Sequence, residues 1–166
     1  MRIYGKLETY SEEPITQEQF DTFVTTCLPA GVMERFKVER DLDIGFSLSE
    51  SECYRLNLMH QKGSIAGVAR RVPLGEMSFA DLELPVVFKS LACSPRGLIL
   101  VTGATGSGKS SSVASIVHYI NTRFAKHIVT IEDPIEFIHR DRKSVITQRE
   151  VGNDTQDFAG SLRQVV

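Results

Sequence analysis

The sequence of 166 residues contains no tryptophan and only three cysteines, Cys27, Cys53 and Cys93. The cysteines lie far apart and include no C-x-x-C pair, so the sequence offers no disulfide framework. The four histidines include no H-E-x-x-H motif, which argues against a dedicated metal cage. We therefore expect reduced thiols, which favour a cytoplasmic protein.

Long apolar runs and a strong net charge are also missing. No run approaches the roughly 18 apolar residues of a membrane span. The first ten residues, MRIYGKLETY, lack the apolar centre of a signal peptide. The net charge of −2 does not favour nucleic acid or an anionic membrane as a partner. The hydrophobic share of 42% is typical of a soluble globular protein.

Residues 1–76 predict a small α+β domain. The spacing of apolar residues indicates a helix over 15–28, with Thr16 as its N-cap and Gln19 in the third helical position of a capping box. The other elements expected here are a short helix over 32–40 and three antiparallel strands over 43–48, 53–60 and 65–72. This domain contains no obvious catalytic cluster.

Proline and glycine punctuate the connection that follows, at Pro73, Gly75 and Pro85. Residues 77–94 are expected to form a linker and a helix over 86–92. We interpret this stretch as the joint between the small domain and a second domain over 95–166.

The second domain has the alternating pattern of an α/β protein. The elements expected in it are strands over 96–103 and 127–131, a helix over 109–124 between them, and a final amphipathic helix over 155–166. Because both strands are almost wholly apolar, we expect them in a parallel sheet that is covered on both faces.

The run GATGSGKS, from Gly103 to Ser110, matches the phosphate-binding pattern G-x-x-x-x-G-K-[ST]. Its glycines let backbone N–H groups turn toward phosphate oxygens, and the following helix adds its unpaired N–H groups. Lys109 can reach the β- and γ-phosphates of ATP, and the Ser110 hydroxyl can ligate Mg²⁺. The residues expected to bind the nucleotide are Gly103, Ala104, Thr105, Gly106, Ser107, Gly108, Lys109, Ser110 and Ser111.

A chance match in a Gly/Ser-rich turn is the alternative to a phosphate site. An apolar segment before the loop and a helical pattern after it are what the phosphate-binding mechanism requires, and both are present. A Rossmann dinucleotide site is poorly supported, because no G-x-G-x-x-G motif closes the turn.

Three carboxylates follow the second predicted strand in IVTIEDPIE (128–136), namely Glu132, Asp133 and Glu136. Carboxylates at the carboxyl ends of parallel strands face the ligand crevice, where one can orient Mg²⁺ and another can polarise the attacking water. The alternative is a turn at Asp133-Pro134 with its acids in solvent.

Three segments resemble the PilT/GspE-type secretion ATPases, and within that group the type IV pilus retraction ATPases: GLILVTGATGSGKSSSVASIVHYIN, HIVTIEDPIEF and QREVGNDTQDFAGSLRQ. The resemblance is dense over 96–164 and weaker toward the N-terminus. It implies a small PAS-like N-terminal domain followed by a RecA-like core in a homohexameric ring. ATP would lie between the core of one subunit and the N-terminal domain of its neighbour.

The resemblance also implies roles for single residues. By position in IEDPIE, Glu136 would be the catalytic glutamate, with Glu132 and Asp133 near the metal and the water. Arginines of the N-terminal domain would neutralise the transferred phosphate, and the matching positions are Arg55 and Arg70, with Arg71 as the alternative to Arg70. The implied partner is an inner-membrane platform protein of a pilus or secretion system, reached from the cytoplasmic face.

The sequence departs from the family pattern at both ends. In the family, a helix and a first strand open the N-terminal domain, whereas Met1 here falls within the segment that resembles its second strand. The sequence also stops after the helix over 155–166, before the strand that carries the family's Walker B acid. Ala104, Ser110 and Ser111 differ from the commoner residues of the family loop but keep the hydroxyl after Lys109. We therefore expect a fragment that binds ATP and hydrolyses it very slowly or not at all.

Three function hypotheses follow. The first is a motor ATPase for pilus retraction, or the related extension and secretion ATPases, which share these motifs. The second is a nucleotide-binding assembly module without its own chemistry. A small-molecule kinase is the third, and it is weakly supported because no acceptor-binding motif or basic lid follows the loop.

Overall fold

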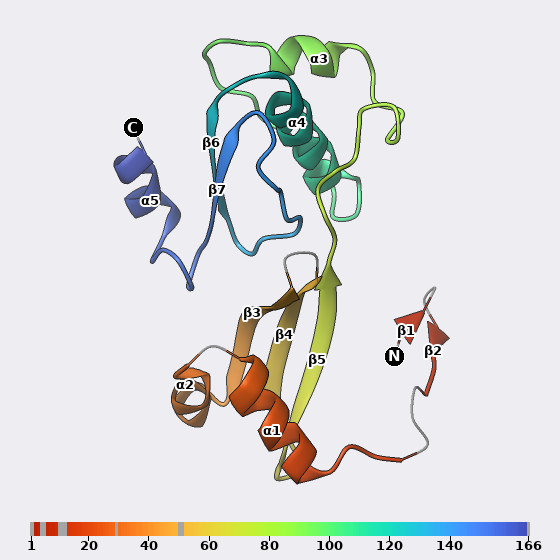
Figure 1. Cartoon of the computed structure of the whole chain (residues 1–166), viewed down its shortest axis with the longest axis vertical. Helices are drawn as coiled ribbons and strands as arrows, with labels where there is room; N and C mark the ends of the chain where they lie inside the picture. The colour runs from red at the N-terminus through yellow and green to blue at the C-terminus, as the bar shows by residue number, and fades with distance from the viewer. Residues whose placement is uncertain (1, 4–5, 10–12, 29, 50–51, 166) are drawn as a thin grey trace.

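The computed structural model places the helices and strands in two groups that are joined by the chain after strand β5 (Figure 1). The structure describes residues 2–3, 6–9, 13–28, 30–49 and 52–165. A short antiparallel pair, β1 (Arg2–Ile3) and β2 (Lys6–Leu7), lies apart from the larger sheet of the first group (Figure 1).

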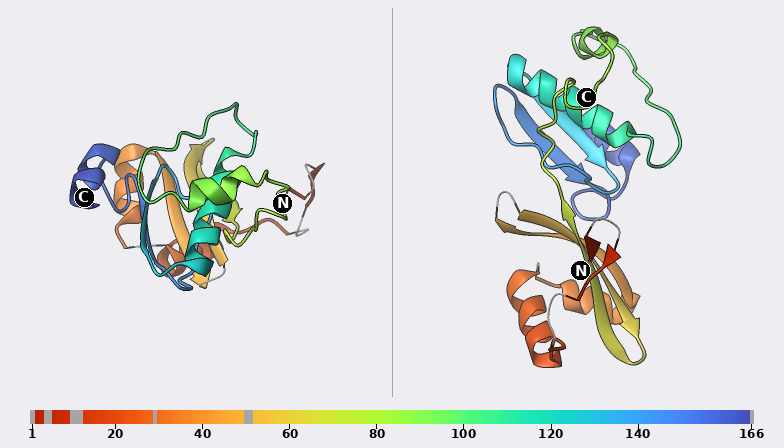
Figure 2. Two further views of the ribbon diagram at one scale, coloured as in Figure 1. Left: turned by 90° about the horizontal axis from the view of Figure 1, so that it is seen from above. Right: turned by 90° about the vertical axis from the view of Figure 1, so that its right-hand side faces the viewer.

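The first group is an antiparallel sheet with two helices on one face (Figures 1 and 2). Its elements are α1 (Gln17–Cys27), α2 (Val32–Glu39), β3 (Asp41–Ser49), β4 (Glu52–Gln61) and β5 (Ser64–Val72), with strand order β3-β4-β5. Thr16 caps α1, and a capping box joins it to Gln19 in both directions, with bonds of 3.2 and 2.9 Å. The predicted helices and strands of this domain are confirmed.

Alternation along the strands explains why this group has one buried face. Leu56 and Leu58 of β4 point toward the helices, where the side chain of Phe36 is also buried. The remaining buried members of this core are Val24, Leu28, Val32, Leu42, Ile44 and Phe46. The intervening residues of β4, including Arg55, therefore lie on the face away from the helices.

The second group contains a parallel pair of strands between helices. Its elements are α3 (Val87–Ala92), α4 (Lys109–Arg123), β6 (His127–Glu132), β7 (Val145–Glu150) and α5 (Phe158–Val165). Helix α4 lies on one side of β6 and β7, and α5 lies on the other (Figures 1 and 2). The α/β fold class and the helix after the glycine-rich loop are confirmed.

The prediction of a strand over 96–103 is wrong. This segment belongs to no strand and loops outward from β6 and β7 (Figure 2). Leu98 and Leu100 are 83% and 76% exposed. An extended segment becomes a strand only against a neighbour that exchanges backbone hydrogen bonds with it, and the described part of the chain provides no such neighbour for 96–103.

Strand β7, which the sequence analysis did not predict, pairs with β6 in parallel. The sequence of β7, VITQRE, is too polar to have been predicted as a covered strand. In the structure, its polar side chains hydrogen-bond to the loop between β6 and β7.

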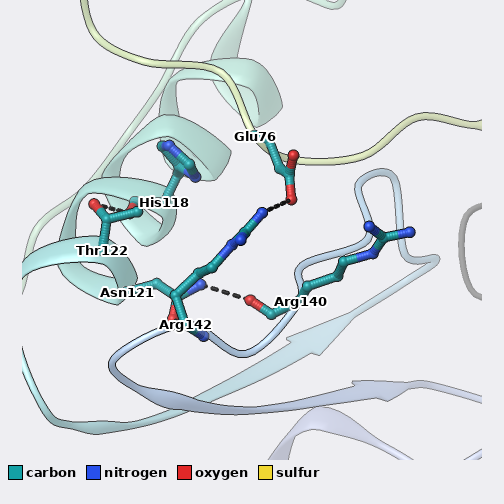
Figure 3. Close-up of polar contacts among 6 residues, drawn as sticks. All are labelled: Glu76, His118, Asn121, Thr122, Arg140 and Arg142. Atoms are coloured by element: carbon teal, nitrogen blue, oxygen red, sulfur yellow. Dashed lines mark hydrogen bonds and ion pairs between the residues drawn. The ribbon is translucent and has the colours of Figure 1, made fainter.

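Asn121, near the end of α4, fixes the helix to the chain that leads into β7 (Figure 3). The Asn121 side chain is 2% exposed; its amide donates to the Arg140 carbonyl at 2.7 Å and accepts from the Arg142 N–H at 3.1 Å. A buried amide is costly unless it is paired, so these two bonds set the distance between α4 and residues 140–142.

Candidate nucleotide-binding site

The glycine-rich loop ends on Gly108, which is the N-cap of α4. Gly108 has φ 87°, a left-handed backbone that favours glycine. Among the described residues, no side chain caps this end of α4, which leaves the N–H groups of its first turn to water or a ligand. The loop and the helix end together have the polarity that binds phosphate oxygens.

The Lys109 ammonium lies over this loop. Its Nζ donates to the carbonyl oxygens of Gly103 at 2.9 Å and Ala104 at 2.7 Å. Both bonds are on the exposed side of the loop, so a phosphate oxygen can replace either carbonyl without a buried group losing its partner.

Two cavities meet at Lys109 and Ser110. One, of about 390 Å³, is lined by Thr105, Gly106, Gly108, Lys109, Ser110, Ser111, Glu136 and Phe137. The other, of about 540 Å³, is also lined by Lys109, Ser110 and Glu136 and extends along β6 to Glu132 and Asp133. The structure therefore brings residues of the predicted phosphate loop and all three predicted carboxylates to the same pair of cavities, although Gly103, Ala104 and Ser107 line neither of them.

The carboxylates differ in how firmly they are held. Glu132, at the end of β6, accepts hydrogen bonds at Oε1 from Thr130 at 2.7 Å and Gln148 at 3.0 Å. Asp133 and Glu136 are exposed, and the bond between Asp133 and Pro134 is cis. The Glu132 carboxylate is thus held by two hydrogen bonds, whereas the Glu136 side chain is accessible to a ligand in either cavity.

The segment after Glu136 is attached to residues 73–76, which follow β5 and lead into the linker (Figure 3). Ile138 accepts from the Gly75 N–H at 2.8 Å and donates to the Pro73 carbonyl at 3.0 Å. The Arg142 guanidinium pairs with Glu76 at 2.8 Å, which lowers the pKa of Glu76. We call these contacts the linker clamp.

His139 lies against the backbone of the linker clamp. A Cβ atom added to Gly75 would collide with the His139 ring, so any larger residue at this position would require the ring to move. Burial lowers the pKa of the His139 imidazole, and the negative charge of Glu132 opposes this effect in part.

We expect the free energy of unfolding to fall when the pH is lowered from 7.5 to 5.5. His139 has a lowered pKa in the fold and an ordinary value near 6.5 when unfolded, so the unfolded chain takes up the proton first. The stability present above pH 6.5 is lost as the pH falls toward the folded pKa, by at most about 1.4 kcal/mol per pH unit. Denaturant titrations at several pH values measure this slope.

His139→Asn is expected to flatten this pH dependence. His127→Asn is the matched control, because His127 is exposed at the start of β6, and it should keep the wild-type slope. Equal slopes for wild type and His139→Asn would show that His139 does not carry the effect.

The two predicted arginines of the small domain lie side by side. Arg55 of β4 is directly opposite Arg70 of β5, whereas Arg71 is opposite Tyr54 and therefore points to the other face. The cavities at Lys109 do not include Arg55 or Arg70. Arg55 instead lines a separate cavity of about 570 Å³ between the two groups.

Sequence analysis did not identify the two β7 side chains that hold residues 133–139, which we call the acidic loop. Gln148 contacts the backbone of Phe137 and His139, and Glu150 accepts from the Ile135 N–H at 3.0 Å. Their spacing of two residues in QREVG, which places both on one face of a strand, is the signal that could have revealed them.

Among the described residues, no three His, Cys, Asp or Glu side chains are grouped closely enough to hold a metal ion. No helix within the described ranges combines the length and the apolar character that crossing a bilayer requires.

Comparison with known proteins now decides the family. The family model for the type II/IV secretion system protein matches residues 68–166. The chain belongs to this family. Over 98% of its length it is 36% identical to a twitching motility protein of Neisseria gonorrhoeae, of which the match covers 43%. It is also 33% identical over its full length to the type IV pilus retraction ATPase PilT of Pseudomonas aeruginosa, of which the match covers 48%.

Structural comparison agrees with the family assignment. The crystal structure of the pilus retraction motor PilT with bound ADP has a TM-score of 0.89 to this chain at 37% sequence identity. The match covers 99% of this chain and 48% of the PilT chain. This secretion-family chain spans slightly less than half the length of the relatives it matches. The similarity confirms the predicted family and the RecA-like α/β fold class.

Proposed function

We propose that this chain is the ATP-binding part of a motor ATPase that powers type IV pilus retraction or a related type II secretion step. The observation that carries the proposal is the meeting of Lys109, Ser110 and Glu136 in the same two cavities. The named relatives, one of them with bound ADP, support a nucleotide as the ligand. The proposed domains are 1–76 and 95–166, joined by residues 77–94.

In this proposal, each residue of the site has one task. The loop from Gly103 to Ser111 would hold the phosphates through backbone N–H groups, and Lys109 would place its charge on the β- and γ-phosphates. Glu136, exposed at the edge of both cavities, would polarise the water that attacks the γ-phosphate.

The donor set also fits Mg²⁺. Ser110, Glu132 and Asp133 present oxygen atoms along one cavity, and oxygen is the ligand that Mg²⁺ prefers. Mg²⁺ at a nucleotide keeps several waters and needs only one or two protein groups, so a cluster of three carboxylates is not required. When bound, the ion neutralises charge on the phosphates. Because Glu132 already accepts two hydrogen bonds, we assign direct ligation to Ser110 and orientation of metal-bound water to the acids.

Arg55 and Arg70 would act on the ATP of a neighbouring copy in a homohexameric ring. Like charges directly opposite each other on adjacent strands repel, and a bound anion relieves the repulsion. The pairing of Arg55 with Arg70 favours Arg70 over Arg71 for this task. An inner-membrane platform protein at the cytoplasmic face of the membrane is the proposed partner.

Mixing of inactive variants tests the proposal. In the complete gene product, Glu136→Gln and the double variant Arg55→Ala/Arg70→Ala should each release almost no phosphate from ATP. A mixture should recover activity, because about one quarter of the interfaces in a randomly mixed ring would join an intact core to intact arginines. Activity in each variant alone would contradict the assigned roles, and no recovery on mixing would contradict the arrangement between subunits.

A further inference from the structure

Gln148, in the middle of β7, makes three hydrogen bonds with its side-chain amide. Its Nε2 donates to Glu132 Oε1 at 3.0 Å and to the Phe137 carbonyl at 2.9 Å, and its Oε1 accepts from the His139 N–H at 2.7 Å. Both amide protons and the oxygen are therefore used. The rotated amide would place its NH₂ against the His139 N–H and its oxygen against two acceptors, so a single orientation satisfies every partner.

The three partners of Gln148 surround Glu136 in the sequence without including it. Glu132 is the last residue of β6, Phe137 directly follows Glu136, and His139 lies two residues further on. Gln148 therefore holds the chain on both sides of Glu136, while the Glu136 side chain stays exposed at the cavities.

Glu150 continues the same support from the same face of β7. Its Oε2 accepts from the Ile135 N–H at 3.0 Å, and its Oε1 accepts from the Asn153 side chain. Residues two apart on a strand point the same way, so Glu150 binds the loop at residue 135 while Gln148 binds it at residues 137 and 139. The backbone that flanks Glu136 is thus fixed by β7.

We propose that Gln148 is a positioning residue that sets the place of the Glu136 carboxylate relative to the phosphate loop. This inference rests on the proposed role of Glu136 in hydrolysis. Proton-transfer groups must lie within hydrogen-bond reach of the reacting water, and a displacement of about 1 Å can cost about 100-fold in rate. None of the hydrogen bonds of Gln148 involves the glycine-rich loop, so we expect the phosphate contacts to survive its substitution.

Two variants separate positioning from folding. Gln148→Ala removes all three hydrogen bonds. Gln148→Glu keeps the length of the side chain and an acceptor for the His139 N–H, but it replaces both donors with a carboxylate beside Glu132. In the complete gene product, both variants should lower kcat for ATP hydrolysis by about 10- to 100-fold and leave the dissociation constant for ATP unchanged.

Amide hydrogen exchange in the 166-residue chain gives an independent measurement. The His139 N–H should exchange faster in Gln148→Ala and stay protected in Gln148→Glu, because only the second variant keeps an acceptor. Gln164→Ala is the matched control, since Gln164 also bonds to β7, through Arg149 at 3.1 Å on the exposed surface. This control should change neither kcat nor the exchange rate of His139.

The outcomes distinguish this inference from the proposed function. If Glu136→Gln abolishes hydrolysis while both Gln148 variants retain the wild-type kcat, the positioning role is wrong and the proposed function stands. If Glu136→Gln hydrolyses ATP normally, the proposed function fails whatever Gln148 does. Failure of both Gln148 variants to fold, or an equal loss of ATP affinity, would also overturn the inference, because Gln148 would then support the fold as a whole.

Discussion

Glu136→Gln is expected to lower ATP hydrolysis by the complete gene product by about 100- to 10,000-fold, the range that a positioned proton-transfer group contributes. The substitution keeps the size of the side chain and removes the carboxylate that would polarise the attacking water. Affinity for ATP should not fall, because the loop and Lys109 supply the phosphate contacts. Steady-state phosphate release and equilibrium binding of ATP measure the two quantities.

Glu34→Gln is the matched control for this prediction, since Glu34 lies exposed on α2 in the other group of elements. It should hydrolyse ATP at the wild-type rate. Normal hydrolysis by Glu136→Gln would mean that another group activates the water, and Asp133 would then be the next residue to test because it lines the same cavity.

Lys109→Ala is expected to weaken binding of ATP by at least about 100-fold, because hydrogen bonds to charged groups contribute about 1.5–3 kcal/mol each and 1.4 kcal/mol corresponds to a factor of ten. The ammonium is the charged group that the structure places over the loop, where it now donates to two backbone carbonyls. Calorimetric titration of the 166-residue chain with ATP and Mg²⁺ measures the affinity directly.

Lys89→Ala provides the comparison for Lys109, because Lys89 is an exposed lysine on α3 outside the cavities at the loop. The fold should survive both substitutions, since the Lys109 side chain bonds only to exposed carbonyls. Wild-type affinity in Lys109→Ala would contradict the assignment of this loop as the phosphate site.

The small domain could be predicted closely because its signals are local. The capping box at Thr16 and Gln19 and the alternation of buried residues along β3 and β4 each involve residues a few positions apart. Their tertiary partners, the two helices and the sheet, are all present among the described residues. Local preference and packing therefore favour the same structure.

The second group of elements could be predicted less well, because its strands depend on partners that are distant in the sequence. Apolar composition alone predicted a strand over 96–103, but pairing decides whether an extended segment becomes a strand, and β6 pairs with β7. The same dependence explains why β7 was missed: its polar residues are matched by the acidic loop, and sequence spacing does not reveal that match.

The candidate site was predictable in its parts but not in its geometry. The glycine-rich loop and the carboxylates could be recognised because their chemistry demands particular residue types. Their meeting in shared cavities is a result of the structure, as is the support from Gln148 and Glu150. The pairing of Arg55 with Arg70 depends on strand register, which the sequence left open between Arg70 and Arg71.

The linker clamp holds the two groups together weakly and reversibly. Two backbone hydrogen bonds at about 0.5–1.5 kcal/mol each and an exposed ion pair at about 0–1 kcal/mol together hold it. Their sum is comparable with the roughly 1–3 kcal/mol by which one site usually influences another. A ligand that breaks these contacts by shifting the chain after Glu136 would free residues 73–76, and the small domain that ends with β5 would then change its orientation at a small cost in free energy.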